Sequence, residues 1–237
     1  VSKICNIPMA RLATELVMRA AETKAANAKT VRPSPLDGLR RLKLQHFGVK
    51  EAVFPFNMFP EVDPILGPEM RSTGEVLGMS DSFEIAFFKA QEATQSRLPT
   101  CGTVLISVND PDKEDALAAA KLFAEIGFKL RATAGTSCFL AEHGIIAEPI
   151  NKLHEGRPNI TDAIANGEIQ LVINTPSGAR SSTDDSYIRK SSIINKIPSI
   201  ATMTAALASA KGIAAVLKSD ETQHPLKSLQ EYHAAIK

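Results

Sequence analysis

The stretch RATAGTSCFLAEHG, residues 131–144, decides the fold class. It continues an apolar strand, FKLRA, and passes through Thr133, Gly135 and Thr136 into a predicted helix that Gly144 closes. A strand that leads directly into a helix is the building block of a β-α-β unit. The first turn of this helix contains no Asp or Glu, so no neighbouring acid neutralises the positive end of its dipole.

The alternation of strand and helix extends over residues 103–217. Short apolar runs such as TVLISV and IQLVIN are separated by helical segments, several of which end at a glycine. This pattern predicts an α/β fold with a doubly wound parallel sheet of about five strands, covered by helices on both faces. The expected strands are 103–108, 128–132, 145–150, 169–174 and 197–201, and the expected helices are 113–126, 136–143, 160–166, 184–195 and 202–217, with one more helix in the tail.

A different pattern precedes this region. Residues 6–28 and 80–93 predict helices, and the Pro- and Gly-rich residues 49–78 predict short strands and tight turns. We expect these elements to form a smaller α+β unit. The expected domains are residues 1–94, a linker at 95–102, and residues 103–237.

Composition and charge exclude several classes of protein. Lys plus Arg is 27 and Asp plus Glu is 26, so no overall charge attracts nucleic acid or an anionic membrane. The apolar runs have the length of strands and are too short for a membrane helix. Cys5, Cys101 and Cys138 are scattered without CxxC spacing, so we expect neither disulfides nor a metal site. We therefore expect the protein to be located in a reducing cytoplasm. Since no secretory signal opens the sequence and Val1 stands first, we expect a piece of a longer chain.

Polar residues follow four of the expected strands, where ligands bind to doubly wound sheets. Gly135 lets a ligand approach the backbone, two threonines add hydroxyl donors, and two lysines from neighbouring loops add positive charge, a combination that suits a phosphate group. The candidate phosphate-binding residues are Lys113, Thr133, Thr136, Lys152, Asn174 and Thr175, with Ser177 nearby.

Several long motifs resemble one enzyme family. The segments ISVNDPDKEDALAAAKLFAEIGFKLRATAGTSCFLAEHGI, NKLHEGRPNI and VINTPSGARSS resemble the C-terminal allosteric domain of the carbamoyl-phosphate synthase large chain, which has a methylglyoxal-synthase-like fold. The segment FGVKEAVFPFNMFPEVDPILGPEMRSTGEVLG resembles the end of the second ATP-grasp synthetase half of that enzyme. The resemblance therefore implies an ATP-grasp remnant followed by a regulatory domain.

The resemblance also implies ligands and contact residues. The family's nucleotide pocket takes its phosphate and ribose contacts from the positions of the six candidate residues above, and the effector would be UMP or UTP, IMP, or phosphoribosyl pyrophosphate. Pro176 stands where other members have a further hydroxyl. Glu51 matches an acid that helps to hold ornithine, whereas the threonine that assists it falls on Ala201, with Thr202 adjacent.

The family's catalytic residues for magnesium and ATP lie upstream of the motifs in this chain. The resemblance therefore implies no catalytic residue, metal or cofactor here, although the parent enzyme uses ATP with Mg or Mn. The parent makes carbamoyl phosphate from bicarbonate and glutamine-derived ammonia for pyrimidine and arginine synthesis. The implied partners are the rest of the large chain and the glutaminase small chain.

Two alternatives of other classes remain. Methylglyoxal synthase shares the fold and the threonine-glycine-threonine loop, but it carries an aspartate in a GPLGGD loop. The loop that we align with it, NTPSGARSS, contains no acid, and the next one is Asp184. The other alternative is a structural or oligomerisation module without a ligand.

Overall fold

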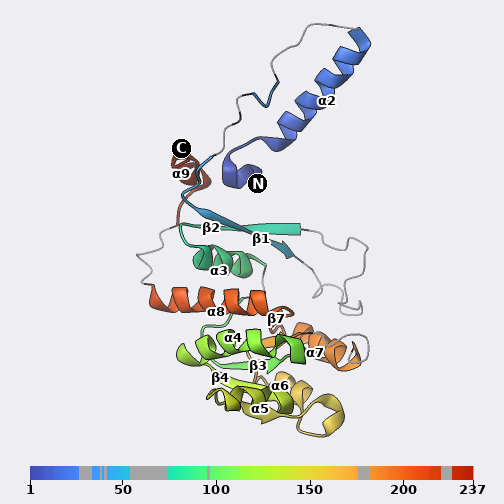
Figure 1. Cartoon of the computed structure of the whole chain (residues 1–237), viewed down its shortest axis with the longest axis vertical. Coiled ribbons are helices and arrows are strands. Elements are labelled where there is room, and N and C mark those ends of the chain that lie inside the picture. Colours follow the sequence, from blue (N-terminus) through green and yellow to red (C-terminus); the bar gives the residue numbers. More distant parts are fainter. Residues whose placement is uncertain are drawn as a thin grey trace. The chain divides into compact units, whose positions relative to one another are not determined.

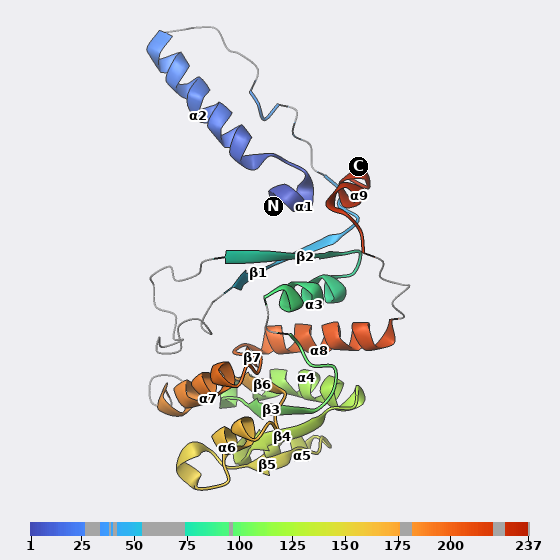
Figure 2. The same ribbon diagram turned by 180° about the vertical axis from the view of Figure 1, so that it is seen from behind.

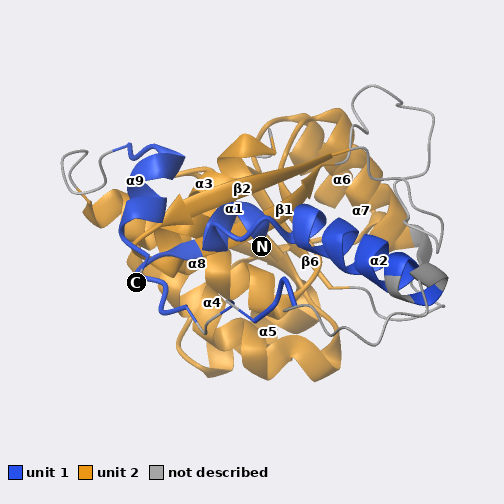
Figure 3. Cartoon of the chain, turned by 90° about the horizontal axis from the view of Figure 1, so that it is seen from above, with its two compact units in different colours: residues 1–47, 225–237 blue, residues 48–224 orange. Residues whose placement is uncertain are grey.

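The computed structural model describes residues 1–26, 34–37, 39, 42–53, 74–94, 97–175, 182–219 and 226–236. The chain divides into two compact units, shown in Figure 3. Unit 1 combines residues 1–47 with residues 225–237, and unit 2 comprises residues 48–224. These units are defined by contacts and do not coincide with the expected domains, whose boundaries stay a prediction.

Unit 2 contains the expected parallel sheet. Its five strands lie in the order β5-β4-β3-β6-β7, and every pair is parallel. The α/β fold with a five-stranded parallel sheet is thus confirmed, although β3, β5, β6 and β7 are shorter than expected because their outer residues make no ladder. The strands are β3 (Thr103–Ser107), β4 (Lys129–Thr133), β5 (Glu148–Ile150), β6 (Leu171–Asn174) and β7 (Ser199–Ile200).

Helices cover both faces of this sheet (Figures 1 and 2). One face packs against α4 (Lys113–Glu125), α5 (Ala134–Glu142) and α8 (Met203–Lys218). The other packs against α6 (Ile160–Ala165) and α7 (Ser182–Ile194). The helices change sides between β5 and β6, which is what right-handed crossovers require when the chain returns past β3.

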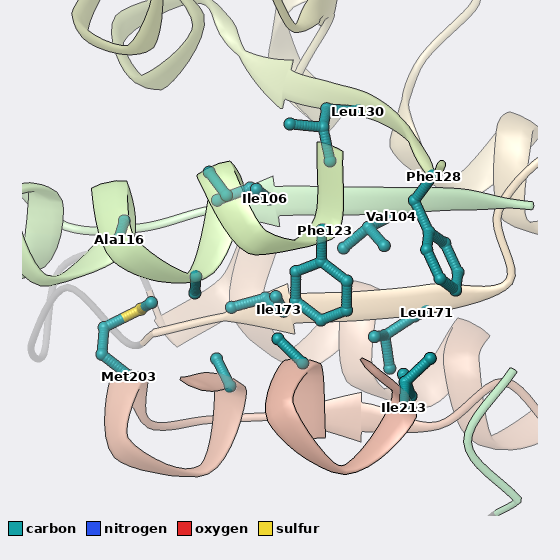
Figure 4. Close-up of a cluster of buried hydrophobic side chains, with 14 of the residues drawn as sticks. Val104, Ile106, Ala116, Phe123, Phe128, Leu130, Leu171, Ile173, Met203 and Ile213 are labelled. Atoms are coloured by element: carbon teal, nitrogen blue, oxygen red, sulfur yellow. The ribbon is translucent and has the colours of Figure 1, made fainter. Parts of the chain in front are cut away.

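The two faces divide the side chains of each central strand. Val104 and Ile106 of β3 lie in the larger cluster with α4 and α8, while Leu105 lies in the smaller cluster with α6 and α7. Figure 4 shows the larger cluster, in which the ring of Phe123 lies among the strand residues. The Phe123 ring meets that of Phe128 edge to face, with centroids 5.6 Å apart. Burial of these apolar groups fixes the position of α4 on the sheet.

A two-stranded sheet and one helix precede this sheet in unit 2. The strands are β1 (Phe47–Val53, beginning at the boundary with unit 1) and β2 (Gly74–Ser80), and the helix is α3 (Phe83–Ala93). A Cβ on Gly78 would lie 2.0 Å from the carbonyl oxygen of Ala86, so only glycine lets β2 approach α3 this closely. On its other side α3 packs against α8 through Phe87 and Phe88. The origin of this region in an ATP-grasp domain stays a prediction.

Unit 1 joins the two ends of the described chain. It contains α1 (Ser2–Cys5), α2 (Met9–Ala26) and α9 (Leu229–Ala234). The imidazole of His46 donates to the carbonyl of Ile4 at 2.9 Å, and that of His233 donates to the carbonyl of Lys3. Both carbonyls belong to the last turn of α1, where no helical N–H remains to satisfy them. The ring of Tyr232 on α9 packs edge-on against His46, so residues from both ends of the sequence stabilise α1.

Candidate functional site

The carboxyl ends of the strands form the candidate site. Ser107 at the end of β3 is in register with Asn174 at the end of β6, and Thr133 of β4 is in register with Ile150 of β5. The helices that follow the neighbouring strands β3 and β6 leave to opposite faces of the sheet. Adjacent strands with connections to opposite faces leave a crevice between them at this edge, which is where doubly wound proteins bind ligands.

The start of α5 differs in register from the sequence prediction. The helix begins at Ala134 rather than at Thr136, because Thr133 occupies the N-cap position. Its hydroxyl does not cap the helix but donates to the hydroxyl of Thr136 at 3.2 Å, and both side chains are buried. The first turn contains no acid, and among the described residues the N-cap side chain makes no capping hydrogen bond to the N–H groups there. An anion is the group that such a helix start favours.

Lys113 lies at the start of α5 although it begins α4. A Cβ built on Gly135 would lie 3.7 Å from the Lys113 ammonium, which is the one described group beyond its own helix turn within 4 Å of it. The same ammonium bonds to the carboxylate of Asp110 at 2.7 Å and lies 6.0 Å from the ring centroid of Phe139. The side chain of Lys113 is only 22% exposed, so its position is held by packing.

Lys152 contributes positive charge to the same region. It precedes the short 3-10 helix η3 (Leu153–Glu155), which follows β5. The pKa of Asp110 lies below its ordinary value because Lys113 donates a hydrogen bond to the carboxylate and because the positive charge of Lys113 favours the ionised form. The charge of Lys152 adds to this effect. Lys113 thus contacts this carboxylate directly, whereas Lys152 acts on it through its charge.

Asn174 and Thr175 lie at the end of β6. The side-chain amide of Asn174 donates to Asp185 at 3.1 Å, whereas its carbonyl oxygen is buried with no hydrogen-bond partner among the described residues. The hydroxyl of Thr175 accepts from the backbone N–H of Asn109 at 3.1 Å and so ties the loop after β3 to that after β6. Pro176 and Ser177 lie outside the described residues.

A pocket that the sequence did not reveal adjoins these residues. It opens between the end of β3 and the first turns of α6 and α7, and its walls combine aliphatic side chains with hydroxyls and carboxylates. Asp184 there accepts from His154 at 2.8 Å. In the sequence, the acidic first turn of α7, the next helix after β6, could have indicated this pocket. The lining residues are Ser107, Val108, Lys152, Leu153, Ile160, Thr161, Asp184, Asp185, Tyr187 and Ile188.

The residues matched to ornithine binding are placed as follows. Glu51 lies in β1, where burial raises the pKa of its carboxyl while the N–H of Ala52 acts in the opposite direction. Thr202 is the N-cap of α8, and its hydroxyl accepts from the N–H of Ala205 at 3.3 Å. Thr202 thus has a structural role, and its ornithine role stays a prediction.

Other features concern metals, thiols and membranes. In the part of the chain that the structure describes, no group of three or more His, Cys, Asp or Glu side chains could hold a metal ion. Cys5, Cys101 and Cys138 are free thiols. None of the described helices has the length and apolar character needed to cross a membrane.

Comparisons with known proteins identify relatives. Residues 115–201 match the model of the MGS-like domain family. The carbamoyl phosphate synthase large chain of Archaeoglobus fulgidus is 45% identical over 98% of this chain and 20% of its own length. The "C-terminal section" of the large chain from Aquifex aeolicus is 42% identical over 98% of this chain and 45% of its own length. The chain thus spans between a fifth and a half of these relatives.

One solved structure that matches part of this chain is a methylglyoxal synthase from Elizabethkingia anophelis. It is 18% identical, covers 57% of this chain and 91% of its own chain, and has a TM-score of 0.39.

Proposed function

Because this chain is the counterpart, over nearly its whole length, of a C-terminal part of carbamoyl phosphate synthase large chains, we propose that it is a regulatory module. In this proposal it binds a phosphorylated nucleotide and modulates the ATP-dependent synthesis of carbamoyl phosphate by the complete enzyme. The rest of the large chain and the glutaminase small chain would be its partners. The chain by itself would not be catalytic.

The observation that carries this proposal is the Lys113 ammonium beside Gly135 at the acid-free start of α5. A phosphate group here would accept hydrogen bonds from first-turn N–H groups and from the hydroxyls of Thr133 and Thr136. Lys113 would supply a charge-assisted bond, the strong class of hydrogen bond. Since Gly135 has no side chain, the backbone of the helix start does not shield the ammonium from a ligand on that side.

The neighbouring pocket suits the nucleoside part of such a ligand. The carboxylates of Asp184 and Asp185 would accept from sugar hydroxyls, and the aliphatic wall of Val108 and Ile160 would contact a base. The same carboxylates would repel a phosphate. The ligand would therefore lie with its phosphate at the start of α5 and its nucleoside in the pocket. The unpartnered oxygen of Asn174 provides one further acceptor at the junction.

The effector candidates are UMP or UTP, IMP, and phosphoribosyl pyrophosphate, all of which carry phosphate on a ribose. Their effect on the parent enzyme would correspond to a coupling free energy of about 1–3 kcal/mol. Ornithine, held near Glu51 with Thr202, would be a second effector. The parent's use of ATP with Mg or Mn belongs to residues outside this chain.

Calorimetric titration of the whole chain with UMP, UTP, IMP, phosphoribosyl pyrophosphate and, separately, inorganic phosphate tests the proposal. We expect saturable heat with the wild type and measurably weaker binding by Lys113→Ala. A folded chain that gives no heat at millimolar ligand, and whose melting temperature no ligand changes, would instead support the structural module without a ligand.

A second candidate function is favoured by the two carboxylates of the pocket. A phosphate-eliminating lyase of the methylglyoxal synthase type needs a general base near its substrate, and Asp184 and Asp185 lie beside the candidate phosphate site. Both are already engaged, Asp184 by His154 and Asp185 by Asn174. Incubation with dihydroxyacetone phosphate distinguishes the two functions, because only the lyase releases methylglyoxal.

A further inference from the structure

Asp110 occupies an unusual position in the candidate phosphate site. It begins the short 3-10 helix η2 (Asp110–Asp112), which joins β3 to α4. Its side chain is 89% exposed, and its carboxylate bonds at 2.7 Å to the ammonium of Lys113, three residues further along the chain. The turn itself is held by a different residue, since the side chain of Asn109 accepts from the N–H of Asp112 at 2.9 Å. The carboxylate of Asp110 is therefore not needed to form the turn.

The surroundings of Asp110 are those that a ligand phosphate would share. Lys113 is the lysine nearest to Gly135, and Lys152 acts on the same carboxylate through its charge. An acid in this place cancels part of the positive charge that the site offers. Because Asp110 is so exposed, rotation of its side chain into water would free the ammonium.

We propose that Asp110 is a built-in counter-anion, which competes with a phosphate ligand for Lys113 and thereby sets the affinity of the site and its dependence on ligand charge. The proposal rests on the function proposed above, since it concerns the regulation of the same site. A ligand must break the Lys113–Asp110 ion pair before its own phosphate can bond to the ammonium. Once the ligand is bound, the remaining carboxylate repels it, and this repulsion grows with the charge of the ligand.

The test compares Asp110→Asn with the wild type by calorimetric titration with UMP and UTP at constant ionic strength. These ligands share base and ribose and differ in phosphate charge. Since exposed ion pairs are weak, the variant should bind UMP about two- to five-fold more tightly, and UTP by a larger factor. Asp115→Asn is the matched control, because Asp115 is an exposed acid in the first turn of the same α4 and has no ion pair with Lys113 among the described contacts.

A second comparison isolates the role of Lys113. In the Lys113→Ala background, Asp110→Asn should change the UMP affinity by a clearly smaller factor, because the two side chains form one interacting pair. Weaker or unchanged binding of UMP by the single variant Asp110→Asn would overturn the proposal and identify Asp110 as a residue that merely positions Lys113. An equal gain with and without Lys113 would also overturn it.

The two levels of inference fail in different ways. If the folded wild type binds neither UMP nor UTP, the proposed function falls and the role of Asp110 falls with it. If the wild type binds and Lys113→Ala binds more weakly, while Asp110→Asn gives no gain, only the counter-anion proposal falls.

Discussion

Replacement of Gly135 by alanine should change stability and ligand binding in opposite directions. Gly135 lies in the first turn of α5, and its backbone is not in the left-handed region. Among the described residues beyond its own helix turn, an added methyl group would touch the Lys113 ammonium, at 3.7 Å, which is an ordinary van der Waals distance. The methyl group therefore fits without strain in the folded chain.

The expected gain in stability comes from the unfolded state. Alanine loses less backbone entropy than glycine when it enters a helix, a difference of about 0.5–1 kcal/mol. For a domain of this size that corresponds to a rise in melting temperature of about 1–4 °C. Binding should suffer because the methyl group occupies the approach to the ammonium. Loss of one charge-assisted hydrogen bond, about 1.5 kcal/mol or more, weakens phosphate binding at least about tenfold.

The assay pairs thermal melting with calorimetric titration of UMP. Ala141→Gly is the control, since it should lower stability at the exposed far end of α5 and leave the affinity unchanged. A Gly135→Ala variant that binds UMP as tightly as the wild type would show that the start of α5 is not the phosphate site. A variant that melts at a lower temperature would contradict the geometry of the helix start.

Three further changes test other residues. Lys113→Ala should weaken UMP binding by about 1.5–3 kcal/mol in a titration, whereas Lys121→Ala, an exposed lysine on the same helix, should leave it unchanged. Thr202→Ala should cost about 1 kcal/mol in denaturant unfolding through loss of the α8 cap, and Thr202→Ser should restore it; an unaffected Thr202→Ala would remove the capping role. Glu51→Gln should raise the melting temperature at pH 7 but not at pH 3.5. Burial raises the pKa of Glu51 in the folded state, so the wild type loses stability as the pH rises from the ordinary pKa of a glutamate through the raised one. An effect that does not depend on pH would contradict the burial of this carboxyl.

The sequence predicted the fold well because local patterns and global packing agree in residues 103–217. Apolar strands such as TVLISV are buried on both faces, which the alternation with helices already indicated. The start of α5 was predicted two residues late. The sequence placed the first helical residue at Thr136, whereas Thr133 at the strand end is the N-cap and Gly135 lies inside the first turn. The terminal residues of a helix depend on tertiary packing and are not encoded locally.

The candidate site was predicted in part. Lys113 and the threonines follow from the rule that ligands bind at the carboxyl ends of strands, because this rule depends only on topology. Asp185 was missed, since an acid near a helix start is normally a dipole or capping residue and only the fold brings it against Asn174. The competing role of Asp110 was missed for a similar reason, because its ion pair depends on the geometry of the η2 turn.

The return of residues 225–237 to the unit that contains residues 1–47 has a consequence for biogenesis. During synthesis on the ribosome, α1 emerges long before the residues that complete its surroundings, His233 and the ring of Tyr232. The sheet of unit 2 contains all of its strands before then and can fold while translation continues. Helix α1 therefore reaches its final environment later than the sheet does, and loss of the residues around Tyr232 and His233 would leave α1 without these partners.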